Sequence, residues 1–152
     1  MRAVIQRVSE ANVEVEGEIV GSISRGYLVL LGVAADDDRA DVEYIVKKVR
    51  DLRLFSSDNA DFDLPIGVIS GEILVVSQFT LLADCRKGRR PDWAGAAGAG
   101  EAEPFYRAVI DALRCEGLVV QEGRFGAKMS VGLINDGPVT IVLDSRRESR
   151  ST

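Results

Sequence analysis

The alternation of hydrophobic and polar residues predicts that β-strands make up much of this chain. Two alternating segments near the amino terminus, Arg2–Val8 and Asn12–Glu16, indicate strands. Gly17 marks a turn, and Glu18–Ile23 then returns as the second arm of a hairpin. Tyr27–Val33 is almost entirely apolar, which is typical of a central strand that is buried on both faces. The beginning of the chain therefore predicts a hairpin followed by an interior strand.

Two later segments have the spacing of amphipathic helices. In the first, about 39–51, the apolar residues at helical spacing are Val42, Ile45, Val46, Val49 and Leu52. Asp36–Asp38 precede this helix, where negative charge favours capping and the helix dipole. The second helix is predicted over Glu101–Arg114, with Gly117 as its stop signal.

The remaining apolar runs predict more strands. Leu52–Phe55 and Leu118–Gln121 are short strands, while Met129–Ile134 and Val139–Leu143 bracket Asn135–Pro138. An Asn/Asp-Gly pair between apolar runs predicts a hairpin, although Pro138 departs from the simple two-residue turn. The pattern as a whole predicts an α+β fold, a small β-barrel-like curved sheet with two covering helices. Residues 1–145 are expected to form a single domain, and 146–152 a disordered tail.

The stretch Gly71–Leu81 combines a buried strand with polar residues at its end. Ile73–Val76 is apolar and largely β-branched, and it is followed by three polar side chains, those of Ser77, Gln78 and Thr80. Strand alternation would place Gln78 and Thr80 on one face and their neighbours on the other. Buried polar groups need partners, so these residues indicate a site at the strand end. A strand that runs into an ordinary polar loop explains the same residues.

Composition and charge restrict the classes of function. Apolar residues make up 46% of the chain and charged residues 28%, as in a soluble globular protein. No apolar run approaches the roughly 20 residues that span a bilayer, and no signal peptide is apparent. Two cysteines are too few for a disulfide framework, which favours a cytoplasmic location.

The chain contains no histidine. A Ser-His-Asp or Cys-His catalytic arrangement and the usual zinc sites are therefore excluded. No compact acidic motif suggests a magnesium site, so neither a metal nor another cofactor is expected. If the protein is a hydrolase, proton transfer must use a carboxylate, a lysine, water or the substrate itself.

A basic cluster stands out from the net charge of −5. It consists of Arg86, Lys87, Arg89 and Arg90. A cluster of this density can bind phosphates, but a solvated loop explains it equally well. The surrounding segment, 83–100, is long for a structureless connection within a domain, which favours a functional loop.

Two separated motifs, SQFTL at 77–81 and NDGPVT at 135–140, resemble the paired signatures of the D-aminoacyl-tRNA deacylase family, also called the D-tyrosyl-tRNA(Tyr) deacylases. The opening MRAVIQRVSEA and the segments RKGRRP at 86–91 and GRFGAKM at 123–129 are also similar to the family. The resemblance spans about 1–145. The glycine-rich loop at 94–100 and DFDLPIG at 61–67 depart from the family pattern, which puts the conformation of these loops in doubt.

The resemblance implies a homodimer with active sites at the subunit interface and no membrane association. The substrate that the resemblance implies is a D-aminoacyl-tRNA, whose ester bond would be hydrolysed to free tRNA and D-amino acid. The resemblance implies a Gly-cisPro dipeptide, Gly137-Pro138, whose carbonyl groups enter the partner's pocket and are braced by Arg7. These carbonyls are expected to reject L-amino acids, which would give chiral proofreading, and glycyl-tRNA is a plausible second substrate. The sequence does not determine whether the Gly137-Pro138 bond is cis or trans. A surface arginine on an edge strand is an alternative interpretation of Arg7.

The same resemblance places Ser77–Thr80 on the other side of the site. The backbone N–H groups of Phe79 and Thr80 are expected to stabilise the oxyanion, and Gln78 to hold the amino acid or the terminal adenosine. The attacking group is either the Thr80 hydroxyl or a water molecule assisted by the 2′-hydroxyl of the terminal ribose. The absence of histidine favours the water molecule. A purely structural Thr80, bonded at a strand end, remains an alternative.

The other expected site residues contact the RNA or border the pocket. The basic cluster, Arg86, Lys87, Arg89 and Arg90, is expected to bind phosphates of the acceptor end of the tRNA. Phe125 is either a core aromatic residue or a platform for adenine, and Met129 either borders the pocket or only packs. The competing function is a non-catalytic nucleic-acid-binding homodimer of the same fold. Salt dependence distinguishes the two, since a pure phosphate binder holds many nucleic acids and releases them as salt rises.

Overall fold

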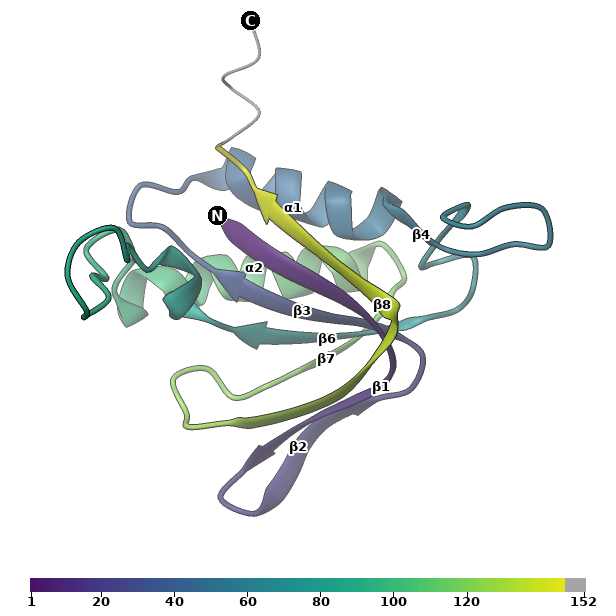
Figure 1. The fold of residues 1–152 in the computed structure, drawn as a ribbon, viewed down its shortest axis with the longest axis horizontal. Helices are drawn as coiled ribbons and strands as arrows, with labels where there is room; N and C mark the ends of the chain where they lie inside the picture. Colours follow the sequence, from purple (N-terminus) through teal and green to yellow (C-terminus); the bar gives the residue numbers. More distant parts are fainter. Residues whose placement is uncertain (147–152) are drawn as a thin grey trace, which may run out of the picture.

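The computed structural model describes residues 1–146, which are organised around a curved, six-stranded mixed sheet. The strands lie in the order β2-β1-β3-β6-β7, and β8 pairs with β1. Their bounds are β1 Arg2–Val15, β2 Glu18–Ile23, β3 Gly26–Gly32, β6 Glu72–Ser77, β7 Val119–Glu122 and β8 Ser130–Asp144. The strands β3, β6 and β7 are parallel to one another, whereas β1 is antiparallel to β2, β3 and β8. Curling of β1, β2 and β8 makes the sheet nearly closed and barrel-like (Figure 1).

Two helices cover one face of this sheet (Figure 1). The first, α1, spans Arg39–Asp51, and the second, α2, spans Ala99–Cys115. The Asp38 side chain accepts a hydrogen bond from the backbone N–H of Ala40 and forms a capping box with Asp41, which fixes where α1 begins. A separate two-stranded sheet, of β4 Arg53–Phe55 and β5 Leu64–Pro65, follows α1. The predicted helices, the short strands and the barrel-like α+β class are confirmed.

The hydrophobic core has two parts because the sheet buries side chains on both faces. One cluster lies between the sheet and the helices and includes Ile5, Val29 and Tyr106. The second lies inside the curled part of the sheet and includes Val13 and Leu74. Burial of a single such apolar side chain contributes about 1.5–3 kcal/mol to folding. Alternate residues of β3 belong to the two clusters, which explains why its apolar run is nearly continuous.

The predicted hairpin at Asn135–Pro138 is wrong. Both apolar runs beside it belong to one strand, β8, and both pair with β1. The strand β1 is also continuous, although two strands were predicted in its place. Gln6 pairs with Thr140 and Val8 with Asn135, so only Arg7 of β1 lies opposite residues 136–139 of β8. The motif is therefore a bulge within a continuous strand, because β1 continues on both sides of it and holds both halves of β8 in line.

The strand β6 ends earlier than strand alternation predicted. It stops at Ser77, and Phe79–Leu82 form a 3₁₀ helix, η1. The predicted placement of Gln78 and Thr80 on one strand face is therefore wrong. The backbone N–H of Gln78 still donates to the carbonyl of Leu31, at 2.8 Å, and the chain turns away from the sheet after that bond.

The amino terminus is anchored beside the end of β8. The α-ammonium group of Met1 donates to Oδ1 of Asp37 at 2.5 Å and to Oγ of Ser145 at 2.8 Å, while the Ser145 hydroxyl donates to Asp41. Arg146 forms an ion pair with Asp36 at 2.5 Å. Of the predicted disordered tail, 146–152, only Arg146 is among the described residues, and 147–152 lie outside them. The single-domain assignment of 1–145 stays a prediction.

Candidate active site

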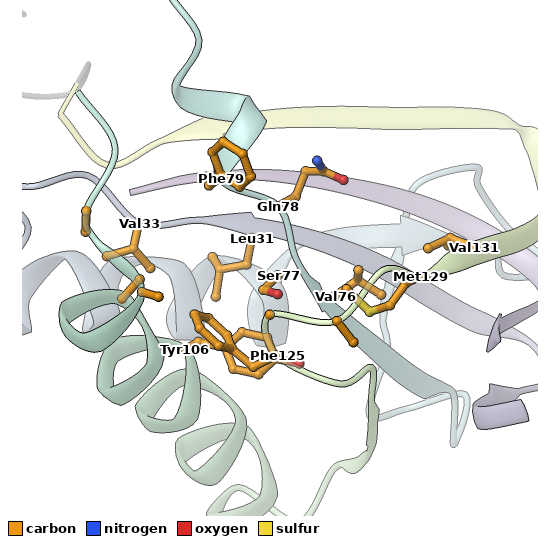
Figure 2. A pocket seen from close by; sticks show the side chains of 15 residues that line it. Leu31, Val33, Val76, Ser77, Gln78, Phe79, Tyr106, Phe125, Met129 and Val131 are labelled. Carbon is orange, nitrogen blue, oxygen red and sulfur yellow. The ribbon is translucent and has the colours of Figure 1, made fainter. Parts of the chain in front are cut away.

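A pocket of about 520 Å³ opens at the carboxyl ends of the parallel strands β3 and β6. The end of β6 and the start of η1 form one wall, and α2 and the segment 125–131 form the other. Figure 2 shows Phe79 on one side of Ser77, with Tyr106 and Phe125 on the opposite side. The lining residues are Leu31, Val33, Val76, Ser77, Gln78, Phe79, Ala97, Ala99, Ala102, Tyr106, Phe125, Gly126, Ala127, Met129 and Val131. Ligand sites favour this position in sheets with parallel strands.

Ser77, Gln78 and Phe79 reach the pocket because η1 packs closely on β3. A Cβ atom on Gly32 would lie 2.5 Å from Cδ2 of Leu82 and 2.9 Å from the carbonyl oxygen of Gln78. Only glycine at this position allows η1 to approach β3 so closely. Arg2 fixes the other end of η1, since its Nη1 donates to the carbonyl of Leu81 at 2.9 Å.

Thr80 lies outside the pocket lining and is exposed. Its hydroxyl accepts a hydrogen bond from the side-chain amide of Gln78. An amide is not a base, so this contact orients the two side chains without activating the hydroxyl as a nucleophile. Of the four predicted residues at 77–80, the structure brings Ser77, Gln78 and Phe79 to the pocket by their side chains.

Two backbone donors lie free at the start of η1. The first hydrogen bond within this helix runs from the N–H of Leu81 to the carbonyl of Gln78, at 3.2 Å. Among residues 1–146, the N–H groups of Phe79 and Thr80 have no acceptor, and no side chain caps η1. Unpaired donors at the edge of a pocket can bind an anion or a developing oxyanion.

Aromatic residues form the wall opposite η1. The Tyr106 and Phe125 rings lie 5.5 Å apart at 48°, and the Tyr106 hydroxyl donates to the carbonyl of Val75 at 3.0 Å. Burial raises the pKa of Tyr106, so its hydroxyl stays protonated at neutral pH. Phe125 is half-buried, so it both packs on the core and lines the pocket. Met129 also does both, in contact with the cluster inside the curled sheet.

Gly137 and Pro138 form the exposed bulge of β8, outside this chain's pocket. The bond between them is cis. Nε of Arg7 donates to the carbonyl of Asp136 at 3.3 Å and forms an ion pair with its carboxylate at 3.2 Å. Nη1 of Arg7 donates to the carbonyl of Leu54 at 2.6 Å. Arg7 therefore connects the bulge to β4.

The bulge and the pocket lie at different places along the sheet. Arg7 pairs with Tyr27 at the beginning of β3, whereas Leu31 lines the pocket near the end of that strand. These positions are separated by four residues along β3, which corresponds to about 13 Å of strand. One chain therefore does not bring the two signature motifs together in one pocket.

The basic cluster lies on a hairpin-like loop that is closed by two backbone hydrogen bonds between Asp84 and Asp92, at 2.8 and 2.9 Å. Arg86 binds the Asp84 carboxylate through two nitrogens, at 2.9 and 2.5 Å. These hydrogen bonds lower the pKa of Asp84 to about 2. Arg86 is therefore paired within the chain, whereas Lys87, Arg89 and Arg90 are exposed and form no ion pair within the described part of the chain.

Sequence reasoning did not single out Trp93. Its ring lies 5.3 Å from that of Phe79, at an angle of 69°. Its position three residues after the basic cluster was a possible signal.

No group of three or more metal-ligating side chains is placed to hold an ion in residues 1–146. No helix in this part of the chain is long and apolar enough to cross a membrane.

Comparison with known proteins decides the family. The sequence model of the D-Tyr-tRNA(Tyr) deacylase family matches residues 4–144. The D-aminoacyl-tRNA deacylase of Thermosipho africanus (strain TCF52B) is 50% identical over 147 residues, which are 97% of this chain and 99% of that protein. The chain belongs to the D-Tyr-tRNA(Tyr) deacylase family.

Other relatives agree. The D-aminoacyl-tRNA deacylase of Desulfatibacillum aliphaticivorans is 49% identical over 146 residues, 96% of this chain and 100% of that protein. A solved structure titled c-Myc DNA Unwinding Element Binding Protein is 40% identical, with a TM-score of 0.89 over 95% of this chain and 98% of that chain. A structure titled as a probable eukaryotic D-amino acid tRNA deacylase is 18% identical, with a TM-score of 0.76 over 93% of this chain and 97% of that chain, and shows the shared fold.

Family membership confirms the resemblance carried by SQFTL and NDGPVT. Members of the D-aminoacyl-tRNA deacylase family are hydrolases that act on aminoacyl-tRNA, and this chain is such an enzyme. The pocket beside SQFTL is its candidate active site.

Proposed function

We propose that this enzyme hydrolyses D-aminoacyl-tRNA, and also glycyl-tRNA, through an RNA-assisted reaction. The observation that carries this proposal is the pocket lining, which contains no carboxylate, lysine or arginine in the described chain. Its only side chains with polar groups for hydrogen bonding are Ser77, Gln78 and Tyr106. The Tyr106 hydroxyl is bonded to the carbonyl of Val75 and stays protonated, so this chain's lining of the pocket offers no general base.

The substrate itself supplies the missing group. The 2′-hydroxyl of the terminal ribose is adjacent to the 3′-ester and positions the attacking water. Water oxygen adds to the ester carbonyl carbon, the bond from that carbon to the 3′-oxygen breaks, and the 3′-oxygen leaves with a proton from the water. The backbone N–H groups of Phe79 and Thr80 stabilise the negative charge on the carbonyl oxygen during attack. The exposed position of the Thr80 hydroxyl supports water, and not Thr80, as the nucleophile.

A second copy of the chain completes the site. Val142, Val4 and Leu30 lie directly opposite one another on β8, β1 and β3, and Val76 at the pocket is opposite Leu30. This apolar row lies on the sheet face away from the helices, and the Val142 side chain is 69% exposed. Exposed apolar surface of this kind supports an interface between subunits. In the homodimer, the bulge of one subunit enters the pocket of the other.

Chiral selection follows from that arrangement. Arg7 holds the bulge, and the carbonyl groups of Gly137 and Pro138 occupy the space that an L side chain needs. A D side chain points away from them, and glycine has no side chain to exclude. Rejection by a clash discriminates between enantiomers without specific contacts to any one D side chain.

The substrate's RNA is held outside the pocket. Lys87, Arg89 and Arg90 contact phosphates of the acceptor end, while Arg86 shapes the loop through Asp84. The enzyme acts in the cytoplasm, where aminoacyl-tRNA is made and used, and its two free cysteines, both exposed, agree with a reducing compartment.

Deacylation of D-tyrosyl-tRNA and L-tyrosyl-tRNA by the wild type and by Thr80→Ala tests the proposal. We expect cleavage of the D ester only, and Thr80→Ala to retain most of the rate. Loss of all activity in a folded Thr80→Ala protein would indicate that the Thr80 hydroxyl takes part in catalysis. Equal cleavage of both esters would contradict chiral selection.

A second candidate function, a non-catalytic nucleic-acid-binding homodimer, is favoured by one relative. The 40% identical structure carries a title that names it a DNA-binding protein. A binder of this kind would cleave neither ester and would hold many nucleic acids, with affinity that falls steeply as salt rises.

A further inference from the structure

Two exposed aromatic side chains lie side by side at the edge of the pocket. The Phe79 side chain, 56% exposed, lines the pocket, and the Trp93 side chain, 39% exposed, packs edge-on against it with ring centroids 5.3 Å apart. Figure 2 shows Phe79 at the start of η1, above the pocket. Aromatic side chains of this size are usually buried, so a paired and exposed set is suited to a flat ligand.

The backbone around Trp93 is fixed by hydrogen bonds. The N–H of Ala96 donates to the carbonyl of Trp93 at 2.9 Å, and the N–H of Ala94 donates to Oδ1 of Asp92 at 2.9 Å. The carbonyl of Gly95 accepts from the N–H of Ala35 at 3.1 Å, which ties this segment to the end of the sheet. The Trp93 ring is therefore presented from an ordered position, at low entropic cost to a ligand.

The charges beside the aromatic pair indicate what that ligand is. Lys87, Arg89 and Arg90 lie on the loop that the Asp84 and Asp92 backbone bonds close, immediately before Trp93. All three are exposed and form no ion pair within residues 1–146. An exposed aromatic pair beside three unpaired cations fits a chain of stacked bases and phosphates better than an apolar peptide.

We propose that Phe79 and Trp93 form a stacking platform for an unpaired nucleobase next to the aminoacylated terminal nucleotide, with flanking phosphates on Lys87, Arg89 and Arg90. This rests on the proposed function, because the ester in the pocket places the single-stranded end of the RNA at Phe79. Stacking tolerates any base, so the platform selects for a single-stranded end and not for a sequence. It distinguishes an acceptor end from a blunt duplex.

Trp93 is the single tryptophan of the chain, so its fluorescence reports on this platform alone. The wild type is titrated with an uncharged RNA hairpin that has a single-stranded 3′ end of four nucleotides, and with the same hairpin made blunt. We expect saturable quenching by the first RNA at concentrations where the blunt hairpin has little effect. Equal quenching by both would overturn the proposal.

Variants provide the second measurement, with labelled RNA and fluorescence anisotropy. Trp93→Ala is expected to weaken binding of the single-stranded end on the order of 10-fold and to raise KM for the charged RNA, whereas Trp93→Phe keeps a ring and stays within about 2-fold of wild type. Phe62→Ala is the control, since Phe62 is an exposed aromatic residue on another loop. Unchanged binding by a folded Trp93→Ala protein would overturn the proposal.

The proposal and the proposed function fail in different ways. Quenching by uncharged RNA without cleavage of D-aminoacyl-tRNA would leave the platform standing and reject the proposed function. Stereospecific cleavage without quenching would do the reverse.

Discussion

A Cβ atom on Gly32 would lie 2.9 Å from the carbonyl oxygen of Gln78, so the last residue of β3 sets how closely η1 approaches the pocket. Gly32→Ala must displace η1, because Cδ2 of Leu82 would also lie 2.5 Å from the new atom. In the proposed mechanism, this displacement would move the N–H groups of Phe79 and Thr80 away from the ester. Loss of a positioned oxyanion donor costs about 10²–10³ in kcat, so we expect a loss of that order in single-turnover deacylation.

Gly100→Ala is the matched control, because a Cβ atom at Gly100 meets nothing within 4 Å and this residue lies inside α2. Its activity should equal that of wild type. Wild-type kcat in a folded Gly32→Ala protein would show that the position of η1 does not matter for catalysis.

Arg7→Ala is expected to loosen the bulge of β8. The Arg7 side chain is 13% exposed and bonds the carbonyls of Leu54 and Asp136, so its loss leaves acceptors unpaired and costs about 1–3 kcal/mol of unfolding free energy. In the proposed mechanism of chiral selection, a mobile bulge would exclude L side chains less well. The ratio of D- to L-tyrosyl-tRNA cleavage should therefore fall, and urea unfolding measures the stability.

Arg53→Ala serves as the control for Arg7, since Arg53 forms only an exposed ion pair, with Asp63 at 3.8 Å. Exposed pairs contribute little, so both stability and stereoselectivity should stay near wild type. An unchanged D-to-L ratio in Arg7→Ala would mean that the bulge does not need this brace.

Val142→Glu tests the interface between two copies. A carboxylate in the apolar row of Val142, Val4 and Leu30 would be desolvated if a second subunit covered it. We expect a shift from dimer to monomer in sedimentation velocity and a parallel loss of deacylation. Ile19→Glu changes an exposed residue of β2, 56% exposed, and should leave both unchanged. A dimeric, active Val142→Glu protein would place the interface elsewhere.

The pH dependence of stability should have a contribution from Asp41. Burial alone would raise its pKa, but hydrogen bonds from Ser145 and the Asp38 backbone, with the charges of the amino terminus and Arg146, hold the pKa below its usual value. The folded state therefore favours the ionised form. This stabilisation is complete above the unfolded pKa of about 3.9 and is lost as the pH falls through the lower folded value.

Asp41→Asn should lower the unfolding free energy by about 1–2 kcal/mol at pH 7 and make its fall below about pH 4 shallower. Urea unfolding at several pH values measures this. Asp58→Asn, at an exposed carboxylate without an ion pair in the described chain, should match the wild-type curve. Identical curves for Asp41→Asn and wild type would contradict the assignment.

The hydrophobic periodicity of the sequence correctly predicted elements whose structure is determined by residues near to them in the chain. The helix predicted at about 39–51 is α1, Arg39–Asp51, because its apolar stripe and its Asp38 cap lie in neighbouring residues. Family signatures predicted the pocket residues Ser77, Gln78 and Phe79. In both cases the information lies within a few residues of the element or motif itself.

The features that sequence reasoning missed depend on distant residues. NDGP has the composition of a hairpin turn, but β1 pairs with both halves of β8 and makes it a bulge opposite Arg7. Close packing on Gly32 accompanies the turn from β6 into η1. Trp93 could be identified as a candidate site residue only from the folded structure, in which its ring packs against that of Phe79.

The role of the substrate's own 2′-hydroxyl is the central claim, and one substitution in the RNA tests it. D-tyrosine is esterified to the 3′-oxygen of a tRNA that ends in 2′-deoxyadenosine, and single-turnover cleavage is compared with that of the ribose form. We expect the deoxy ester to bind, as competition for the ribose substrate shows, and to be cleaved at least about 100-fold more slowly, the lower range for one positioned catalytic group. Equal cleavage of the two esters would contradict RNA-assisted hydrolysis and require a catalytic group from the protein.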